Sequence, residues 1–349
     1  MNKLIIEQFT MLTKQIQADH TASLSKGDNK EATKHAFRLK SIKNALNALK
    51  KVDFEIVDAN DVKNVNGIGK GSLERINEIL TTGKLKEISE DVNEKVAGIL
   101  ELSKVIGIGN KKANYYATKY NIKSIKQLKD AHDKNKIILD DKVILGLKYY
   151  GVIQKNIPRK EITMIRKYLQ RIGKDIDDQL EIEICGSYRR GSLESGDIDV
   201  IMFHPYMKKL DHIKNPIKYD LINYLESFVT FLSESGFLLD HMTDKNFKMK
   251  YMGFCKYKLN PVRRIDIRLM PYDSMSASLL YFTGPVELNI VMRKEAQKKD
   301  MLLNEYGLFK KEAEGSVIPI KTKIEKDIFT KLGMPYLTPI ERNIYSNKK

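Results

Sequence analysis

The sequence predicts a multidomain protein that is all-α in its N-terminal part and α+β in its C-terminal part. Apolar residues recur at helical spacing up to about residue 155, and a short glycine motif occurs twice in that region. Beyond about residue 180, strand-like runs of β-branched residues alternate with helical segments. A chain of 349 residues has room for two or three domains of ordinary size.

Composition indicates an intracellular protein with a polyanionic partner. The net charge is +16, and residues 96–160 hold 14 Lys and Arg against 5 Asp and Glu. Such a localised excess favours a nucleic-acid-binding face over general solubility. Cys185 and Cys255 are expected to be buried thiols rather than a disulfide, which suits the nucleus or the cytoplasm. The sequence shows no signal peptide and no apolar run approaching ~20 residues, so secretion and membrane insertion are not expected.

The first 160 residues are expected to be predominantly helical. Apolar spacing predicts helices over 3–18 and 30–50, with the polar stretch at 21–31 as the loop between them. A further helical region follows at 96–155, and breaks are expected near Gly107, Asn121 and Gly151.

A glycine motif is repeated forty positions apart in this part of the chain. Val65-Asn-Gly67-Ile-Gly69 recurs as Val105-Ile-Gly107-Ile-Gly109, each followed after three residues by an apolar residue. The glycines permit a tight turn, and the helix that follows presents free backbone amides to a phosphate. A single Gly-Ile-Gly is usually an ordinary turn, but two in one register predict paired helix-hairpin-helix motifs.

The central motif spans residues 185–200 and reads CGSYRRGSLESGDIDV. In a strand, Asp197 and Asp199 share one face while Ile198 points into the core. Two adjacent acids in a partly dry site stay ionised only when cations neutralise them, so a pair of magnesium ions is expected. An isolated Asp-x-Asp is usually a solvated strand end. Here a Gly-Ser pair stands nine residues before the Asp-x-Asp, and the loop between them offers amides, hydroxyls and a guanidinium to phosphate. A Gly-Ser pair followed at this distance by Asp-x-Asp is the signature of the nucleotidyltransferase fold.

The remaining elements complete an α+β arrangement. Ile157-Pro158 interrupts the helical pattern and marks a domain junction. The expected helices lie at 161–173, 216–235, within 274–299 with a break at residues 281–285, and at 321–331; the expected strands lie at 237–243, 247–257 and 262–270. Period-two alternation in the last strand places Asp266 on one face with Arg264 and Arg268. Taken alone, this acid would be a structural ion pair.

The central motif closely resembles the palm motif of the family X DNA polymerases, the family of DNA polymerase beta. Further matches follow in the same order: RRIDIRLMP at 263–271, YFTG at 281–284, NEY at 304–306 and EKDIF at 325–329. The resemblance runs from about residue 30 nearly to the C-terminus. The resemblance implies four parts. Residues 1–95 would form a helical, lyase-like N-terminal domain that contains the first hairpin and binds a 5′-phosphate, and residues 96–155 a basic DNA-binding subdomain with the second hairpin. Residues 156–270 would form a nucleotidyltransferase-fold palm with a mixed sheet, and residues 271–349 a C-terminal α/β nucleotide-selection subdomain.

The resemblance implies a monomeric, templated DNA polymerase that fills short gaps in base excision repair. Its partners would be gapped or nicked double-stranded DNA and deoxynucleoside triphosphates. One alternative is a template-independent terminal transferase, although no extra palm loop is evident. The other is a non-catalytic DNA-end-binding scaffold, which is expected to lack the three acids.

The resemblance also implies roles for individual residues. Asp197, Asp199 and Asp266 would be catalytic and bind two Mg²⁺, with Mn²⁺ as the alternative, and Asp266 would accept the proton of the primer 3′-hydroxyl. The implied nucleotide contacts are Ser187, Arg190, Ser195, Gly196, Tyr281, Phe282, Gly284 and Asn289. The implied DNA contacts are Gly67, Gly69, Lys70, Gly107, Gly109, Lys250, Arg264, Arg293 and Tyr306. Carbonyls of Lys63, Val65, Ile68, Ser103, Val105 and Ile108 would hold Na⁺ or K⁺ at the two hairpins.

The sequence departs from the family pattern in places that bear on activity. Arg75 occupies the position of the lysine that forms a Schiff base in the lyase reaction, and an arginine does not readily form that imine. Glu74 is retained, and Lys63 and Lys70 lie nearby in the sequence. Because of Arg75, lyase activity is expected to be absent or moved to another lysine such as Lys70. Asn156 replaces an arginine that approaches the triphosphate, so that contact is not expected. Val286 and Ile290 replace an acid and a lysine, which is expected to change contacts to the base and the template.

Overall fold

The structure is a computed structural model that describes residues 2–25, 27–153, 156–243, 247–312 and 315–346. The chain divides into two compact units, residues 1–139 and 140–349, and each is described by itself. No helix in the described ranges is long and apolar enough to cross a membrane. Cys185 and Cys255 are free and buried, as predicted.

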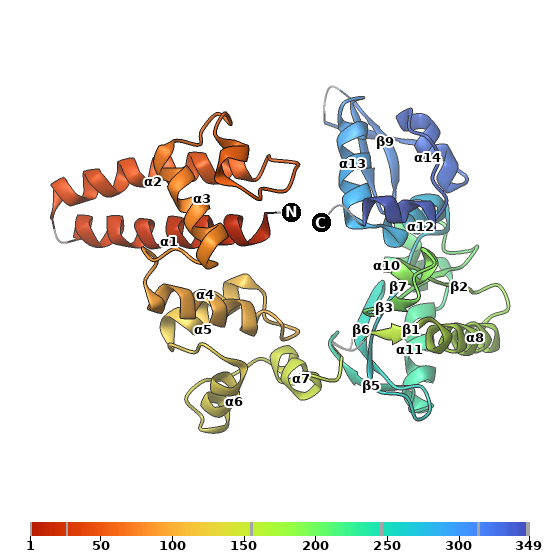
Figure 1. Cartoon of the computed structure of the whole chain (residues 1–349). Coiled ribbons are helices and arrows are strands. Elements are labelled where there is room, and N and C mark those ends of the chain that lie inside the picture. The colour runs from red at the N-terminus through yellow and green to blue at the C-terminus, as the bar shows by residue number, and fades with distance from the viewer. Residues whose placement is uncertain (1, 26, 154–155, 244–246, 313–314, 347–349) are drawn as a thin grey trace. The chain divides into compact units, whose positions relative to one another are not determined.

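The first unit begins with two long antiparallel helices, α1 (Lys3–Ser25) and α2 (Asn29–Leu49) (Figure 1). Together with α3 (Lys70–Thr82), they enclose one apolar core, and this core includes Phe9 of α1 and Ile76 of α3. The predicted loop at 21–31 is wrong for most of its length, because α1 continues to Ser25 and α2 begins at Asn29. Asp28 sets the start of α2 by accepting a hydrogen bond from the Glu31 amide at 3.0 Å, so the connection is a short turn.

The predicted repeat is confirmed as two hairpins with the same backbone geometry. Amide-to-carbonyl bonds from Ile68 to Val65 and from Ile108 to Val105 are both 3.0 Å long. Gly67 and Gly107 have φ values of 97° and 90°, the left-handed region that favours glycine. The remaining elements of this unit are η1 (Ala59–Val62), α4 (Glu90–Leu102), α5 (Asn110–Lys119) and α6 (Ile125–Asp133).

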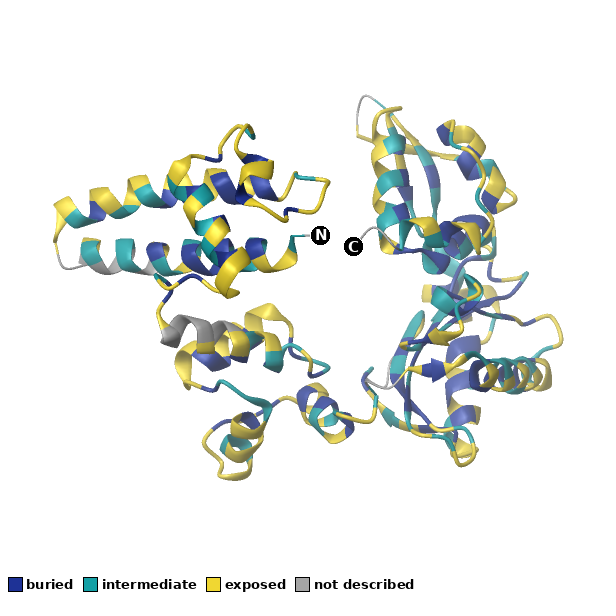
Figure 2. Ribbon diagram, viewed as in Figure 1, coloured by how far each residue is buried: buried dark blue, intermediate teal, exposed yellow. Residues whose placement is uncertain are grey.

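A five-stranded mixed sheet organises the second unit, in the order β2-β4-β7-β6-β5. Its strands are β2 (Glu181–Ile184), β4 (Ile198–Phe203), β5 (Leu238–His241), β6 (Lys250–Cys255) and β7 (Arg263–Leu269). Only the β4–β7 pairing is parallel among the described strands of this sheet. The strands are largely buried in Figure 2, which places the core of the unit around them.

Helices cover the sheet on both sides. The helices α8 (Arg159–Ile176) and α11 (Tyr224–Glu234) pack in one core with Ile198 and Val200. The alternate residues Ile201 and Phe203 pack in a second cluster with Met275 and Leu279 of α12 (Met275–Thr283). Because Asp199 alternates with Ile198 and Val200, it lies on the α12 side of the sheet.

Short elements connect the sheet and its helices, and two of them differ from the elements that the sequence predicts. The helix predicted over 216–235 is split into η2 (Pro216–Tyr219) and α11, because Asp220 adopts a left-handed conformation and Asn223 caps α11. The expected loop after β2 begins with a one-turn helix, α9 (Gly186–Arg189). The other short elements are α7 (Asp141–Tyr149), β1 (Ile157–Pro158) paired with β3 (Glu194–Ser195), α10 (Leu210–Lys214) and η3 (Tyr272–Ser274).

The C-terminal part of this unit is a small α/β layer. Gly284 ends α12 and Pro285 precedes α13 (Val286–Gln297), so the predicted break between these helices is confirmed. A three-stranded antiparallel sheet of β8 (Met301–Asn304), β9 (Gly307–Lys311) and β10 (Val317–Ile320) follows. The chain then forms α14 (Glu325–Leu332), which starts later than predicted, and η4 (Glu341–Tyr345).

Candidate active site

Three acids meet where β4 and β7 lie side by side. Asp199 and Asp266 are direct partners in the parallel pairing, and Asp197 immediately precedes β4. Burial alternates along β7, with Ile265 and Ile267 fully buried and Asp266 on the half-buried face. The predicted period-two arrangement is therefore confirmed, and it brings together acids that are almost seventy positions apart in the sequence.

The environment of Asp197 and Asp199 opposes the charged forms of these two acids. Burial, together with the charges of Asp197 and Asp266, raises the pKa of Asp199 to about 7. Burial and the charge of Asp266 also raise the pKa of Asp197, although Arg264 acts in the opposite direction. Crowded, partly buried carboxylates of this kind are stabilised in ionised form by a cation.

Arg264 supplies positive charge to the acids in this structure. Its Nη2 lies 2.9 Å from Oδ2 of Asp266 and 3.7 Å from Oδ2 of Asp197. Within the described ranges, no three His, Cys, Asp or Glu side chains are arranged as a metal site. The donor set is nevertheless the one that hard divalent cations prefer, because it consists of carboxylate oxygens that lack sufficient compensating charge.

Gly186 brings the start of α9 directly against the acids. A Cβ atom at this position would lie 2.5 Å from Oδ2 of Asp199, and the backbone φ is +56°. The neighbouring Cys185 amide donates to the Asp199 carbonyl at 2.8 Å, which fixes this junction to β4. Both the close approach and the backbone conformation require glycine at this position.

A cavity of about 460 Å³ lies beside the acids. It is lined by Gly186, Ser187 and Arg190, by Asp197 and Asp199, by residues 281–287 and Asn289, and by Ser346. Most of the residues predicted to contact a nucleotide therefore line one space. Ser195 stands just behind it, with its hydroxyl 2.8 Å from that of Ser187, and Gly196 directly precedes Asp197.

The far wall of the cavity is built from the break between α12 and α13. The Asn289 side chain donates to the Tyr281 carbonyl at 2.8 Å, which fixes the turn. The guanidinium groups of Arg293 and Arg268 each lie 5.0 Å from a ring centroid, of Tyr281 and Phe282 respectively.

The helix α13 presents apolar side chains away from the core on this side. Val286 is 68% exposed and Ile290 is 47% exposed. The helical stripe that they share with Asn289 and Arg293 is therefore not a core face, which leaves it accessible to a ligand.

Sequence reasoning missed a polar network behind the cavity. Arg190 donates from Nη1 to the Thr283 carbonyl at 2.6 Å and from Nε to Asn343 at 3.1 Å. Next to it, Arg189 and Arg342 both pair with Glu325 at 2.7 Å. These partners are distant in sequence. Thr283 and Glu325 belong to stretches that the sequence singled out, whereas Arg342 and Asn343 do not.

Other predicted residues of this unit have identifiable settings. Lys250 lies opposite Arg268 across β6 and β7, and burial together with that charge lowers its pKa. Tyr306 is half-buried, and its amide binds the Asn304 side chain at 2.9 Å. The Asn156 side chain donates to Glu194 at 2.8 Å, and the loss of a triphosphate contact at that position stays a prediction.

Arg75 in the first unit is part of an ion-pair cluster. It pairs with Glu87, which also pairs with Arg38, and it donates from Nη1 to the Gly71 carbonyl at 2.7 Å. The hydrogen bond to Glu87 raises the pKa of Arg75 further. This residue is held as a charged structural group, whereas Lys70 and Glu74 nearby are exposed.

The hairpin glycines Gly69 and Gly109 directly precede α3 and α5, so the N-terminus of each helix lies at its hairpin. The Val65 and Val105 carbonyls each accept one hydrogen bond within their hairpin. Binding of Na⁺ or K⁺ by the carbonyls of Lys63, Val65, Ile68, Ser103, Val105 and Ile108 stays a prediction.

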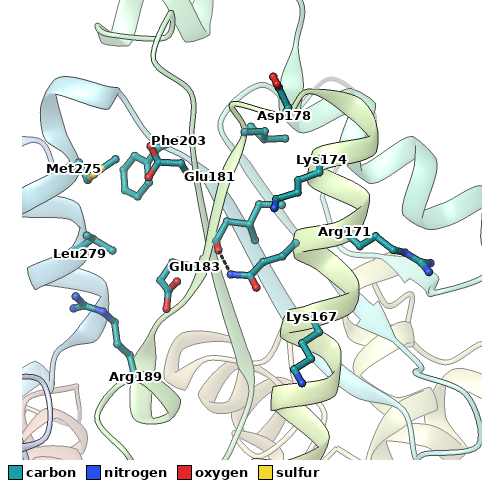
Figure 3. A pocket seen from close by; sticks show the side chains of 13 residues that line it. Lys167, Arg171, Lys174, Asp178, Glu181, Glu183, Arg189, Phe203, Met275 and Leu279 are labelled. Carbon is teal, nitrogen blue, oxygen red and sulfur yellow. Dashed lines mark hydrogen bonds between the residues drawn. The ribbon is translucent and has the colours of Figure 1, made fainter.

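A second and larger cavity, of about 830 Å³, lies at the exposed edge of β2 (Figure 3). Lys167, Arg171 and Lys174 of α8 form one wall, and Met275 and Leu279 of α12 lie opposite. None of the residues predicted to act in catalysis or in nucleotide or DNA binding lines this cavity. It is thus separate from the candidate active site.

The sheet, the three clustered acids and the adjoining cavity define a palm of the nucleotidyltransferase fold. Residues 156–272 match the DNA polymerase beta palm, residues 278–343 match the DNA polymerase beta thumb, and residues 1–85 match a helix-hairpin-helix domain. The palm and thumb regions of this chain therefore match those of the family X DNA polymerases.

Individual relatives agree with this assignment. The chain is 32% identical to DNA polymerase lambda of Arabidopsis thaliana, over 86% of this chain and 57% of the relative. It is 30% identical to DNA polymerase lambda of Rattus norvegicus, over 86% and 51%. Identity to the DNA nucleotidylexotransferase of Xenopus laevis is 24%, over 86% and 62%. The chain therefore spans between half and two thirds of the length of these relatives.

Proposed function

We propose that this protein is an intracellular DNA polymerase that fills short gaps during DNA repair. The observation that carries the proposal is the pairing of Asp199 with Asp266, because Asp199 lines a cavity together with Arg190. Acids and a guanidinium in one space suit a reaction in which a nucleoside triphosphate meets a nucleophilic hydroxyl.

Family X polymerases use divalent metal ions, and we propose Asp197, Asp199 and Asp266 as their ligands here. Two magnesium ions, or manganese in their place, would supply the chemistry of aligning a primer 3′-hydroxyl with the α-phosphate and neutralising charge. Arg264, which pairs with two of the acids, would have to release them and become available to the DNA backbone. Asp266 would then accept the proton of the 3′-hydroxyl.

The cavity side chains would bind and orient the nucleotide. Arg190, Ser187, Ser195 and Gly196 would hold the triphosphate through charge-assisted and neutral hydrogen bonds. Tyr281 and Phe282, with the turn at Gly284, would form a wall beside the sugar that disfavours a 2′-hydroxyl. Asn289 and Arg293 on α13 would meet the base and the template, beside the apolar pair Val286 and Ile290.

The helical N-terminal half would hold gapped or nicked double-stranded DNA without reading its sequence. The two hairpins present backbone amides to phosphates, and residues 96–160 carry most of the charge excess. We propose the same division into four parts as the family resemblance implies, with the protein acting as a monomer. The N-terminal domain would bind a downstream 5′-phosphate but lack lyase activity at Arg75.

A terminal transferase is the second candidate, since the chain resembles a DNA nucleotidylexotransferase over 86% of its length. Primer extension on a one-nucleotide gap, with and without a 5′-phosphate, separates the candidates when compared with the same primer single-stranded. Templated insertion on the gap supports the proposal, and untemplated extension of the single strand supports the alternative. Extension no greater than that of an Asp266→Ala control on every substrate would leave only DNA binding.

A further inference from the structure

Two adjacent arginines behind the cavity are held in chemically different ways. Arg189 forms an ion pair with Glu325, with Nη2 and Oε2 2.7 Å apart. The hydrogen-bond partners of Arg190 among the described residues are both neutral, namely the Thr283 carbonyl and the Asn343 amide oxygen. The charge of Arg189 is therefore compensated within the protein, whereas that of Arg190 is available to a ligand.

We propose that Asn343 is a positioning residue that presents Arg190 to the triphosphate of the incoming nucleotide. Its side chain makes a reciprocal pair, because Oδ1 accepts from Arg190 Nε at 3.1 Å while Nδ2 donates to the Arg190 carbonyl at 2.8 Å. The inference rests on the proposed function, since it assigns a role within the nucleotide site.

The hydrogen bonds of Arg190 leave the Nη2 edge of its guanidinium open. Nε and Nη1 are engaged, and Nη2 makes no hydrogen bond to any residue that the structure describes. Arg190 lines the same cavity as Asp197 and Asp199. A guanidinium fixed by neutral oxygens can bind an anion without first losing rotamer freedom, which is the benefit of preorganisation.

The segment that carries Asn343 is firmly anchored to this part of the unit. The neighbouring Arg342 is fully buried and pairs with Glu325 at 2.7 Å. On the other side, a Cβ atom at Gly191 would lie 3.2 Å from Ile340, so the phosphate loop packs directly on this segment. Within this segment, Ser346 lines the cavity.

The test measures KM for the incoming nucleotide and kcat on a one-nucleotide gap with the full chain. Asn343→Ala should raise KM about tenfold, the usual worth of hydrogen bonds to a charged group, and leave kcat within about twofold. Ile344→Ala is the matched control on the same segment, because Ile344 is 57% exposed. Its KM should equal that of the wild type.

Asn343→Asp distinguishes positioning from a structural role. A purely structural role predicts that Asn343→Asp raises KM less than Asn343→Ala, since the isosteric aspartate keeps the acceptor for Arg190 Nε. Positioning predicts the reverse order, because the carboxylate neutralises Arg190 and repels the triphosphate. In an Arg190→Ala background, Asn343→Ala should raise KM no further.

An unchanged KM in Asn343→Ala, or a further rise in the Arg190→Ala background, would overturn the inference. If Asn343→Ala does not fold, judged by circular dichroism, the Asn343→Asp variant decides: a KM equal to that of the wild type overturns the inference. Failure of the wild type to extend the gapped primer would instead reject the proposed function, so the two failures are distinguishable.

Discussion

Nη2 of Arg264 lies 2.9 Å from Oδ2 of Asp266, on the strand that also provides the partner of Asp199. The guanidinium therefore compensates part of the negative charge at the point where a divalent cation is expected. Arginine and metal ion would compete for the same carboxylate oxygens.

Replacing Arg264 with glutamine should strengthen metal binding by the protein without DNA. The neutral amide removes the competing charge, so the apparent Mn²⁺ affinity should rise severalfold. Each ~1.4 kcal/mol by which the arginine opposes metal binding corresponds to about a tenfold rise in affinity. Electron paramagnetic resonance of free Mn²⁺ measures this directly. Arg171→Gln on the outer face of α8 serves as a charge-matched control. Equal Mn²⁺ affinity in Arg264→Gln and the wild type would contradict the competition.

The pKa of Asp199, raised to about 7 by burial and the neighbouring acids, makes metal-free stability depend on pH. In the unfolded chain the same group titrates near ~4. The stabilising contribution of protonated Asp199 to the free energy of unfolding is therefore fully present below pH ~4 and is lost as the pH rises through about 7.

Asp199→Asn mimics the neutral acid and should remove this dependence. Relative to the wild type in chelator, the variant should gain on the order of 2 kcal/mol in free energy of unfolding between pH 5 and pH 8. Urea titration at both pH values measures the gain, and Mg²⁺ should abolish it by stabilising only the wild type. If the difference in free energy of unfolding between Asp199→Asn and the wild type is the same at pH 5 and pH 8, the predicted titration of Asp199 is excluded.

Gly186→Ala should abolish insertion while DNA binding is kept. The new Cβ would meet the Asp199 carboxylate at 2.5 Å, in a backbone conformation that alanine disfavours. Gly236→Ala is a suitable control, since Gly236 also has a positive φ, of +71°, but no atom within 4 Å of the added Cβ. Both variants should lose about 1 kcal/mol of stability, but only Gly186→Ala should lose activity. Full activity in Gly186→Ala would show that the close approach does not matter.

Borohydride trapping on an incised abasic substrate tests the lyase prediction. The wild type should give no covalent adduct above background, because Arg75 is held as a cation by Glu87 and cannot form an imine. Arg75→Lys should produce an adduct whose yield increases with pH, since Glu87 favours the protonated amine. A strong wild-type adduct that disappears in Lys70→Ala would show that the nucleophile has moved.

The sequence predicted those parts of the fold and site that depend on local periodicity. Alternation around Asp199 and Asp266 was sufficient to place both on one face, and repeated glycines were sufficient for the hairpins, because these patterns are set by backbone geometry. Helix limits were less predictable. The segment at 21–31 is polar, yet helix α1 continues into it, since exposed helical turns need no apolar residues.

Contacts between distant segments could not be read from local pattern. Arg190 and Asn343 are 153 positions apart, and no spacing rule connects an asparagine near the C-terminus to a phosphate loop. The pairing of Arg264 with Asp197 likewise depends on the register between β4 and β7. Such register is fixed by packing of the whole sheet.

Templated insertion into a one-nucleotide gap by Asp266→Ala, compared with the wild type under single-turnover conditions, tests the central claim most directly. The account predicts that the variant loses roughly a thousandfold or more in insertion rate, with affinity for gapped DNA within about twofold. Asp199→Ala should behave in the same way. Insertion by Asp266→Ala at the wild-type rate would contradict the claim that the acids of β4 and β7 form one catalytic centre.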